Sequence, residues 1–134
     1  MPLLQRKSLL AIAAVVNVAL QKDGKRVSAK TRAARHGLPP RHLELVLQSL
    51  VQGGILKGVR GPYGGYELAR ERHSVTAQDI LRAASVHETG EEPSSEIVDK
   101  VVLPILSVAE REFAQALSRI SLDDMVQCAV VNGH

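Results

Sequence analysis

The sequence predicts a mainly α-helical fold that contains one small β-hairpin and ends in a long helix. Hydrophobic residues make up 45% of the 134 residues, which is the length of a single domain. Only Tyr63, Tyr66 and Phe113 are aromatic, so the core is aliphatic and suits helices. Capping residues, glycines and prolines divide the first part of the chain into helical segments. Two short β-type runs then flank a glycine-rich loop.

Charge is unevenly distributed along the chain. Residues 1–72 contain 13 Lys and Arg against 4 Asp and Glu, whereas residues 73–134 contain 4 against 10. The net charge of +3 therefore hides a basic first half and an acidic second half. A basic half favours a polyanionic partner, and a solvated charged surface is the alternative that composition leaves open.

The same composition excludes several classes of protein. The single cysteine, Cys128, excludes an intrachain disulfide framework and a cysteine-rich metal site. The histidines show no metal-ligand spacing, and no Ser/His/Asp or paired-carboxylate arrangement indicates an enzyme. The longest apolar run, residues 9–16, is shorter than the roughly 18 residues of a membrane span, and no secretory leader follows Met1. We therefore expect a soluble cytoplasmic protein that is not an enzyme.

Three helices are predicted before the hairpin. The first covers residues 6–20, where apolar side chains occupy more than one face. Ser28 is a typical N-cap for a short helix over residues 29–36. Pro40 suits the first turn of a helix over residues 40–52. Because a short turn with glycine separates the last two helices, they form a helix-turn-helix pattern.

The helix over residues 40–52 is amphipathic. Its apolar residues follow the i, i+3, i+4, i+7 spacing and predict a buried face made of Leu43, Val46, Leu47 and Leu50. The opposite face carries donors and acceptors that can address base edges in a major groove, namely Arg41, Glu44, Gln48 and Gln52, with Leu45 among them. An ordinary solvated helix face has the same composition and is the alternative.

A β-hairpin is predicted to follow directly. Its strands are residues 55–59 and 66–69, and the glycines and proline of the loop between them are typical of a tight turn. A hairpin directly after a helix-turn-helix makes a winged helix, and we call this hairpin the wing. Lys57 and Arg60 give the wing positive charge, and its glycines allow close approach to a phosphate chain. A nucleotide-phosphate loop would need a following helix and a Lys-Ser or Lys-Thr pair, and the sequence offers neither.

The C-terminal half is predicted to be helical around one exposed loop, residues 86–96. Thr76-Ala77-Gln78-Asp79 and Ser121-Leu122-Asp123-Asp124 both have the form of a capping box at a helix start. Pro104 either kinks the long helix between them or begins a second one. The apolar stripe of that helix either folds back on the domain or, as we expect for a palindromic DNA site, pairs with a second copy. The predicted dimer interface is Ile97, Val101, Ile105, Val108, Phe113 and Leu117.

Three stretches resemble the Rrf-type bacterial transcription regulators, the family of IscR, NsrR and CymR. They are Arg41-His42-Leu43-Glu44, residues 50–56, and residues 59–69, where Arg-Gly-Pro-x-Gly-Gly-Tyr is specific to the family. The resemblance covers residues 1–85 and continues more weakly to Ile120-Ser121-Leu122. It implies a winged helix-turn-helix domain over residues 1–85, a loop over 86–96 and dimerisation helices over 97–134. The implied function is that of a homodimeric repressor on a palindromic operator.

The resemblance also implies how the parts meet DNA. The helix over residues 40–52 would enter the major groove, and the wing would reach the minor groove through Arg60 and Gly61. Glu44 matches a position at which members present a glutamate to bases, and Arg60 matches the wing arginine. Arg32 departs from the family, which usually has an aliphatic core residue there. The predicted DNA contacts are Ser28, Lys30, Arg41, His42, Glu44, Leu45, Gln48, Lys57, Arg60, Gly61 and Tyr63. A winged-helix module that binds proteins instead of specific DNA is the alternative function.

The cofactor of the family is not expected in this chain. Cluster-bearing members place three cysteines in the loop between residues 86 and 103, and this chain has none there, while Leu103 stands where one subgroup has a histidine ligand. Because Fe–S clusters are held chiefly by thiolates, we predict no cofactor. Cys128 is predicted to be a small core residue, with thiol sensing as the alternative. The predicted partners are double-stranded DNA and a second copy of the chain, and the sequence identifies no effector.

Overall fold

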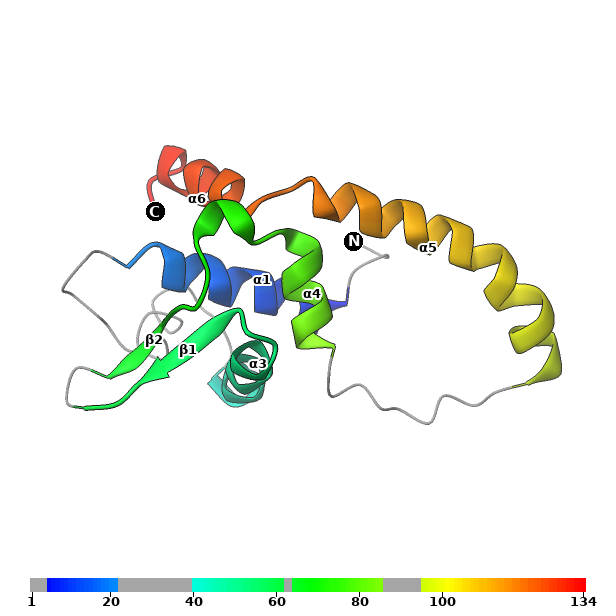
Figure 1. The fold of residues 1–134 in the computed structure, drawn as a ribbon, viewed down its shortest axis with the longest axis horizontal. Coiled ribbons are helices and arrows are strands. Elements are labelled where there is room, and N and C mark those ends of the chain that lie inside the picture. Colours follow the sequence, from blue (N-terminus) through cyan, green and yellow to red (C-terminus); the bar gives the residue numbers. More distant parts are fainter. Residues whose placement is uncertain (1–4, 22–39, 62–63, 86–94) are drawn as a thin grey trace.

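The computed structural model describes residues 5–21, 40–61, 64–85 and 95–134. Figure 1 shows a body formed by helices and one hairpin, from which the long helix before the last one projects. In chain order the elements are α1 (Arg6–Ala19), α3 (Pro40–Gln52), β1 (Leu56–Val59), β2 (Gly65–Leu68), the 3₁₀-helix η1 (Arg72–Ser74), α4 (Ala77–Ala84), the π-helical turn η2 (Val98–Val102), α5 (Leu103–Ser118) and α6 (Leu122–Val131). The predicted mainly α-helical fold with a small β-hairpin is confirmed.

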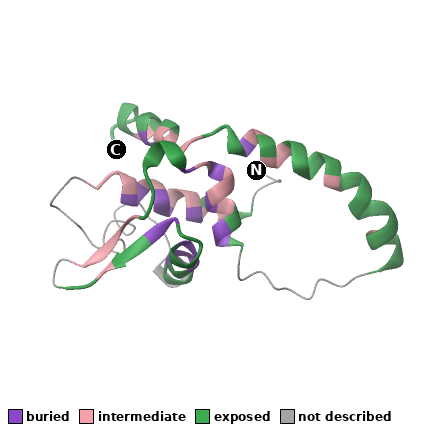
Figure 2. Ribbon diagram, viewed as in Figure 1, coloured by how far each residue is buried: buried purple, intermediate pink, exposed green. Residues whose placement is uncertain are grey.

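The core lies where α1, α3, α4 and α6 meet, as the purple segments of Figure 2 show. The four apolar residues predicted for the inner face of α3 are all buried, since the 3.6-residue period places them on one side. Alanines on the buried sides of α1 and α4 keep these helices close together. The largest fully buried side chains are Leu50, Ile55, Leu56, Ile80, Leu122, Val15, Val46 and Val75.

The end of α3 packs directly against α4. A Cβ added to Gly53 would collide with the side chain of Ala83, so only glycine fits between the two helices there. Gly54 follows with φ +78°, a left-handed conformation that side chains rarely adopt. The two glycines therefore end α3 and turn the chain toward β1.

The wing is a two-stranded antiparallel hairpin. Its register pairs Leu56 with Leu68, Lys57 with Glu67, Gly58 with Tyr66, and Val59 with Gly65. The strands begin and end within a residue of the predicted positions. At the base of the hairpin, the Ala69 N–H donates to the Ile55 carbonyl at 3.0 Å. Two leucines anchor the hairpin at this base: Leu56 is fully buried, and Leu68 packs against the core.

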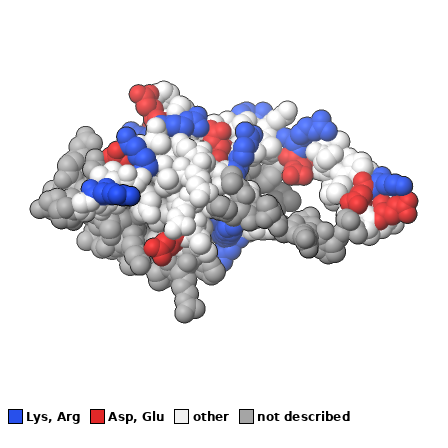
Figure 3. Space-filling view, turned by 60° about the horizontal axis from the view of Figure 1, so that its bottom comes forward, with Lys and Arg blue, Asp and Glu red and all other residues white. Residues whose placement is uncertain are grey.

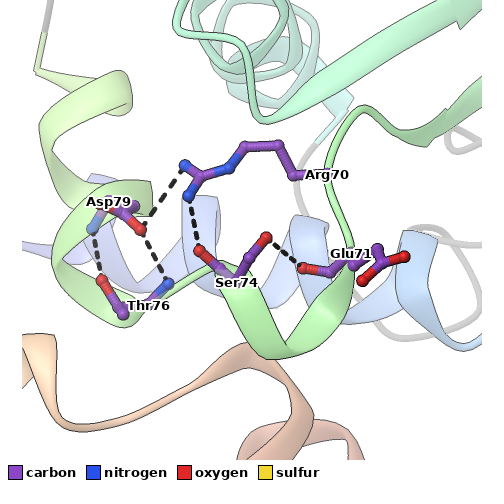
Figure 4. Close-up of polar contacts among 5 residues, drawn as sticks. All are labelled: Arg70, Glu71, Ser74, Thr76 and Asp79. Carbon is purple, nitrogen blue, oxygen red and sulfur yellow. Dashed lines mark hydrogen bonds and ion pairs between the residues drawn. The ribbon is translucent and has the colours of Figure 1, made fainter.

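The segment after the wing is held by the polar network of Figure 4. Arg70 donates from Nη2 to the Ser74 carbonyl at 2.6 Å, and its Nη1 lies 3.6 Å from Asp79 Oδ2. Asp79 and Thr76 form the predicted capping box: the Asp79 N–H donates to Thr76 Oγ1 and the Thr76 N–H donates to Asp79 Oδ2, both at 3.1 Å. The Ser74 hydroxyl donates a hydrogen bond to the backbone carbonyl of Glu71 at 2.8 Å. The chain leaving the wing is thereby fixed to the start of α4.

The turn between α5 and α6 lies against that same segment. Ser121 and Asp124 form the second predicted capping box, and an isolated antiparallel bridge joins Thr76 to Ser121. The Leu122 N–H donates to the Val75 carbonyl at 2.7 Å. The two helix starts therefore support each other through the backbone.

The long helix α5 is preceded at its outer end by the irregular turn η2. In η2 the Leu103 N–H donates to the Val98 carbonyl, five residues back. Pro104, which has no N–H, lies in the first turn of α5 directly after this widened turn. Of the two predicted alternatives for Pro104, the structure shows a helix start that follows a π-helical turn without a break.

The structure corrects one sequence prediction, the environment of Cys128. Cys128 is exposed, and the small core residue predicted there is wrong. Helix α6 buries Leu122 and Val126, one turn apart, and Cys128 lies about 200° round the helix from Val126, away from the core. Along the predicted stripe of α5, Leu117 is buried within this chain and Ile105 is exposed, and the dimer interface stays a prediction. The predicted helix over residues 29–36 and most of the loop 86–96 lie outside the described residues.

Among the described helices, none combines the length and apolar character that a membrane span requires.

Candidate nucleic-acid interface

One face of helix α3 is exposed to solvent. Glu44, Leu45, Gln48 and Gln52 are exposed, and Leu45 has 64% of its surface accessible. Ser49, between them in sequence, is buried, and its hydroxyl donates to the Leu45 carbonyl at 3.1 Å. Val51 is exposed on this face as well, so the outward face carries one carboxylate, two amides and two aliphatic side chains. This set can accept from and donate to base edges and contact a thymine methyl.

The direction of this face is fixed by the core. The opposite side of α3 is buried against α1 and α4. Gly53 allows α3 to approach α4 more closely than any other residue would. A rigid inner face means that the outward side chains keep a constant orientation, which readout of a groove requires.

The wing carries two exposed basic side chains among its described residues, and one of them is paired within the wing. Lys57 Nζ lies 3.0 Å from Glu67 Oε1, its direct cross-strand partner in the register. Arg60, at the end of β1, is exposed, and the following Gly61 has φ +119°. The charge of Lys57 is thus partly balanced within the wing, and Arg60 is the basic group that the described part of the turn offers to a ligand.

Charges over this side of the molecule are mixed. Figure 3 shows Lys and Arg side chains interspersed with Asp and Glu over the described surface, with large uncharged areas between them. Several basic residues of the first half belong to residues 22–39, which lie outside the described part of the chain. The described basic side chains of the first half are therefore those of Arg6 and Lys7 in α1, Lys57 and Arg60 in the wing, and Arg70 and Arg72.

The predicted DNA contacts fall into three groups. Glu44, Leu45 and Gln48 lie on the exposed face of α3, and Lys57, Arg60 and Gly61 lie on the wing. The backbone of Arg41 and His42 belongs to α3, and their side chains are not among the described parts of the structure. The residues Ser28, Lys30 and Tyr63 lie outside the described residues altogether.

Sequence reasoning missed two residues that shape this surface. Glu67 pairs with Lys57, and the hairpin register could have revealed it, since the two residues are directly opposite. Gln21 joins the end of α1 to β2 by a hydrogen bond to the Tyr66 carbonyl at 2.9 Å. No local pattern signals this contact, because the two residues are 45 positions apart.

The described residues offer no candidate metal centre. No group of three or more His, Cys, Asp or Glu side chains in the described ranges could hold a metal ion. His73 instead contacts a neighbouring carboxylate, with Nε2 at 3.2 Å from Glu71 Oε2. Cys128, the single thiol of the chain, lies on the exposed side of α6.

Comparison with known proteins identifies a family of regulators. Residues 4–128 match the profile of the Rrf2 family, described as an iron-dependent transcriptional regulator. A Synechocystis sp. protein named as an HTH-type transcriptional regulator, slr0846, is 32% identical over 128 residues, covering 91% of this chain and 86% of that protein. The IscR regulator of Cereibacter sphaeroides is 38% identical over 88 residues, covering 64% of this chain and 56% of that protein. The match thus spans most of the first relative and about half of the second.

Solved structures agree with this assignment. The IscR of T. potens superposes with a TM-score of 0.75 at 27% identity, covering 98% of this chain and 90% of that chain. The B. subtilis CymR, named a global cysteine regulator, has a TM-score of 0.67 at 25% identity, covering 92% of this chain and 95% of that chain. These neighbours are winged-helix regulators, so the predicted winged helix is confirmed and regulation is favoured over a protein-interaction module.

The iron named in the family description does not fit the residues of this chain. A cluster needs several thiolates, and the sequence has one cysteine, with none in residues 86–103. That cysteine lies in α6, where no carboxylate or histidine cluster among the described residues accompanies it. The fold, the exposed face of α3, the wing and the match over residues 4–128 nevertheless lead to one conclusion: this chain is a transcriptional regulator that belongs to the Rrf2 family.

Proposed function

We propose that this regulator is a cytoplasmic repressor that binds a near-palindromic operator as a homodimer and carries no Fe–S cluster. The observation that carries the proposal is the pairing of two features: an outward face of α3 suited to base edges, and a wing that ends in an exposed arginine. In this arrangement α3 enters the major groove and Arg60 reaches the adjacent minor groove.

Each element has a separate task in the proposed complex. Glu44, Leu45 and Gln48 read base edges, since a carboxylate accepts from cytosine, an amide pairs with adenine and an aliphatic group contacts a thymine methyl. Arg60 binds the backbone or a narrow groove through its charge. Lys57 supports the shape of the wing through Glu67 and contributes less to phosphate binding than an unpaired lysine would.

The dimer is supported by the long helix. Its outer part exposes large apolar side chains in a single chain, and Figure 2 shows this part almost entirely exposed. An apolar helix face of this length is normally covered by a partner. A second copy is the partner that operator symmetry requires. Of the predicted interface, Ile97, Val101, Ile105 and Val108 are exposed, Phe113 is half-buried and Leu117 is buried within this chain.

Selection from a randomised DNA pool with the purified full chain tests the function. We expect enrichment of a near-palindrome whose half-sites are about 10 base pairs, or a multiple, apart. The affinity should fall linearly with salt concentration on a double-logarithmic plot, because Lys and Arg release counterions from DNA. Recovery of no motif, or binding that salt does not affect, would show that the protein does not act through specific DNA.

A further inference from the structure

The side chain of Gln21 joins the middle of the wing to the body of the protein by a hydrogen bond, next to Tyr66, whose side chain packs against the core. Gln21 lies two residues after the end of α1. Its Nε2 group donates to the Val18 carbonyl at 3.1 Å and to the Tyr66 carbonyl of β2 at 2.9 Å. A single amide therefore satisfies one carbonyl at the C-terminus of a helix and one on a strand.

The Tyr66 carbonyl is on the outer edge of the hairpin. The bond from the Ala69 N–H to the Ile55 carbonyl makes these two residues a hydrogen-bonded pair. Such pairs alternate along an antiparallel ladder, so Gly58 and Tyr66 form a non-hydrogen-bonded pair whose backbone groups point away from each other's strand. The Gln21 amide thus occupies an acceptor that the hairpin ladder leaves open.

This contact lies between the anchored base and the exposed turn of the wing. The base is held by Leu56, which is fully buried, and by Leu68. Beyond it, Lys57, Gly58 and Arg60 are exposed. A two-stranded hairpin has little stability of its own, so the direction of its outer part depends on contacts with the body.

The chemistry of the amide makes its orientation specific. Both partners are carbonyl oxygens, so the NH₂ group must face them and the reversed amide would place oxygen against oxygen. The Oε1 atom is buried and finds no donor among the described residues. Both hydrogen bonds that the amide makes within the described part of the chain use its NH₂ group, so the donor contacts decide its position.

We propose that Gln21 is a positioning residue for DNA binding, which holds β2 so that Arg60 at the wing turn meets the groove at the correct angle. This inference rests on the proposed function, because it requires Arg60 to contact DNA. Gln21 itself contacts no DNA in the proposal and acts through the Tyr66 carbonyl.

A double-mutant cycle on the selected operator tests the proposal. Gln21→Met keeps the length of the side chain and removes both donors. We expect Arg60→Ala to weaken binding roughly tenfold in the wild-type background, and less than about threefold in the Gln21→Met background. Gln127→Met is the matched control, since the Gln127 amide donates to Asp123 within α6 and does not reach the wing.

The outcomes separate this inference from the proposed function. Equal fold-changes for Arg60→Ala in both backgrounds overturn the role of Gln21 and leave DNA binding by the wing intact. No effect of Arg60→Ala in the wild-type chain overturns the wing contact itself. Hydrogen exchange of the full chain is the second measurement: Gln21→Met should speed exchange in the wing and leave α3 unchanged. Unchanged exchange in the wing would show that the bond from Gln21 to the Tyr66 carbonyl does not hold the wing. If Gln21→Met does not fold, Gln21→Ala takes its place in the cycle.

Discussion

Thr76 and Ser121 face each other across an isolated antiparallel bridge, and each of them caps the helix that follows it. The first of these helices follows the wing, and the second follows the long helix α5. Arg72 strengthens the junction, with Nε at 3.5 Å from Asp123 Oδ1. The bridge therefore connects the segment that leaves the wing to the turn that ends α5.

Removing either cap should destabilise the fold. Thr76→Ala and Ser121→Ala each remove a hydroxyl that accepts a backbone N–H, and we expect a loss of about 1 kcal/mol in the free energy of unfolding for each. Because the two residues are paired, the double variant should deviate from the sum of the single effects. Urea denaturation measures all three. Ser118→Ala, whose hydroxyl only donates within α5, is the matched control and should be nearly neutral.

Gly53 should not tolerate a side chain. Gly53→Ala places a methyl group against Ala83, and we expect a loss of about 1–3 kcal/mol in the free energy of unfolding from overpacking. Gly58→Ala is the control, because a Cβ there meets no atom within 4 Å. Adding Ala83→Gly to Gly53→Ala should restore part of the lost stability. Equal thermal stability of the Gly53 and Gly58 variants would contradict close packing of Gly53 against Ala83.

Arg60 and Gln48 should differ in the kind of binding they support. Arg60→Ala should weaken binding to operator and random DNA alike, or relax a preference for a narrow A·T-rich minor groove. Gln48→Ala should cost about 1–3 kcal/mol at one base pair of the operator only. Titration of both variants against the operator, its single-base changes and random DNA distinguishes these effects. The same loss for both variants on every DNA would argue against direct readout by α3.

The exposed stripe of α5 should control the oligomeric state. Ile105 has 68% of its surface accessible in a single chain, and Ile105→Glu should convert a dimer to a monomer and weaken operator binding. Val131→Glu is the control, since it makes a similar change at an exposed position on α6. Sedimentation equilibrium of both variants measures the change. A dimer that survives Ile105→Glu would place the interface elsewhere.

The purified protein should be colourless. With one cysteine in the chain, protein purified without oxygen should show no visible absorption and should bind its operator fully in the presence of an iron chelator. Cys128→Ser should bind DNA as the wild type does. Visible absorption together with loss of binding on iron removal would show that this chain holds a cluster through other ligands.

The sequence by itself determined the local features of this protein. Thr76 and Ser121 predict helix starts, because a capping box joins residues three positions apart. The inner face of α3 follows from its helical period, and the glycines at 53–54 and 61 mark positions where the chain must turn. These preferences act within a few residues, so they can be read without knowing what packs against them.

Only the tertiary structure decided which surfaces are covered. Leu117 and Ile105 belong to one predicted stripe, yet the first is buried beside α4 and the second is exposed on the projecting part of α5. Cys128 resembles a core residue in sequence and is exposed, because α6 docks through Leu122 and Val126. The bond from Gln21 to Tyr66 spans 45 residues. Contacts of this kind depend on how helices and strands pack against one another, and local sequence preferences do not determine that packing.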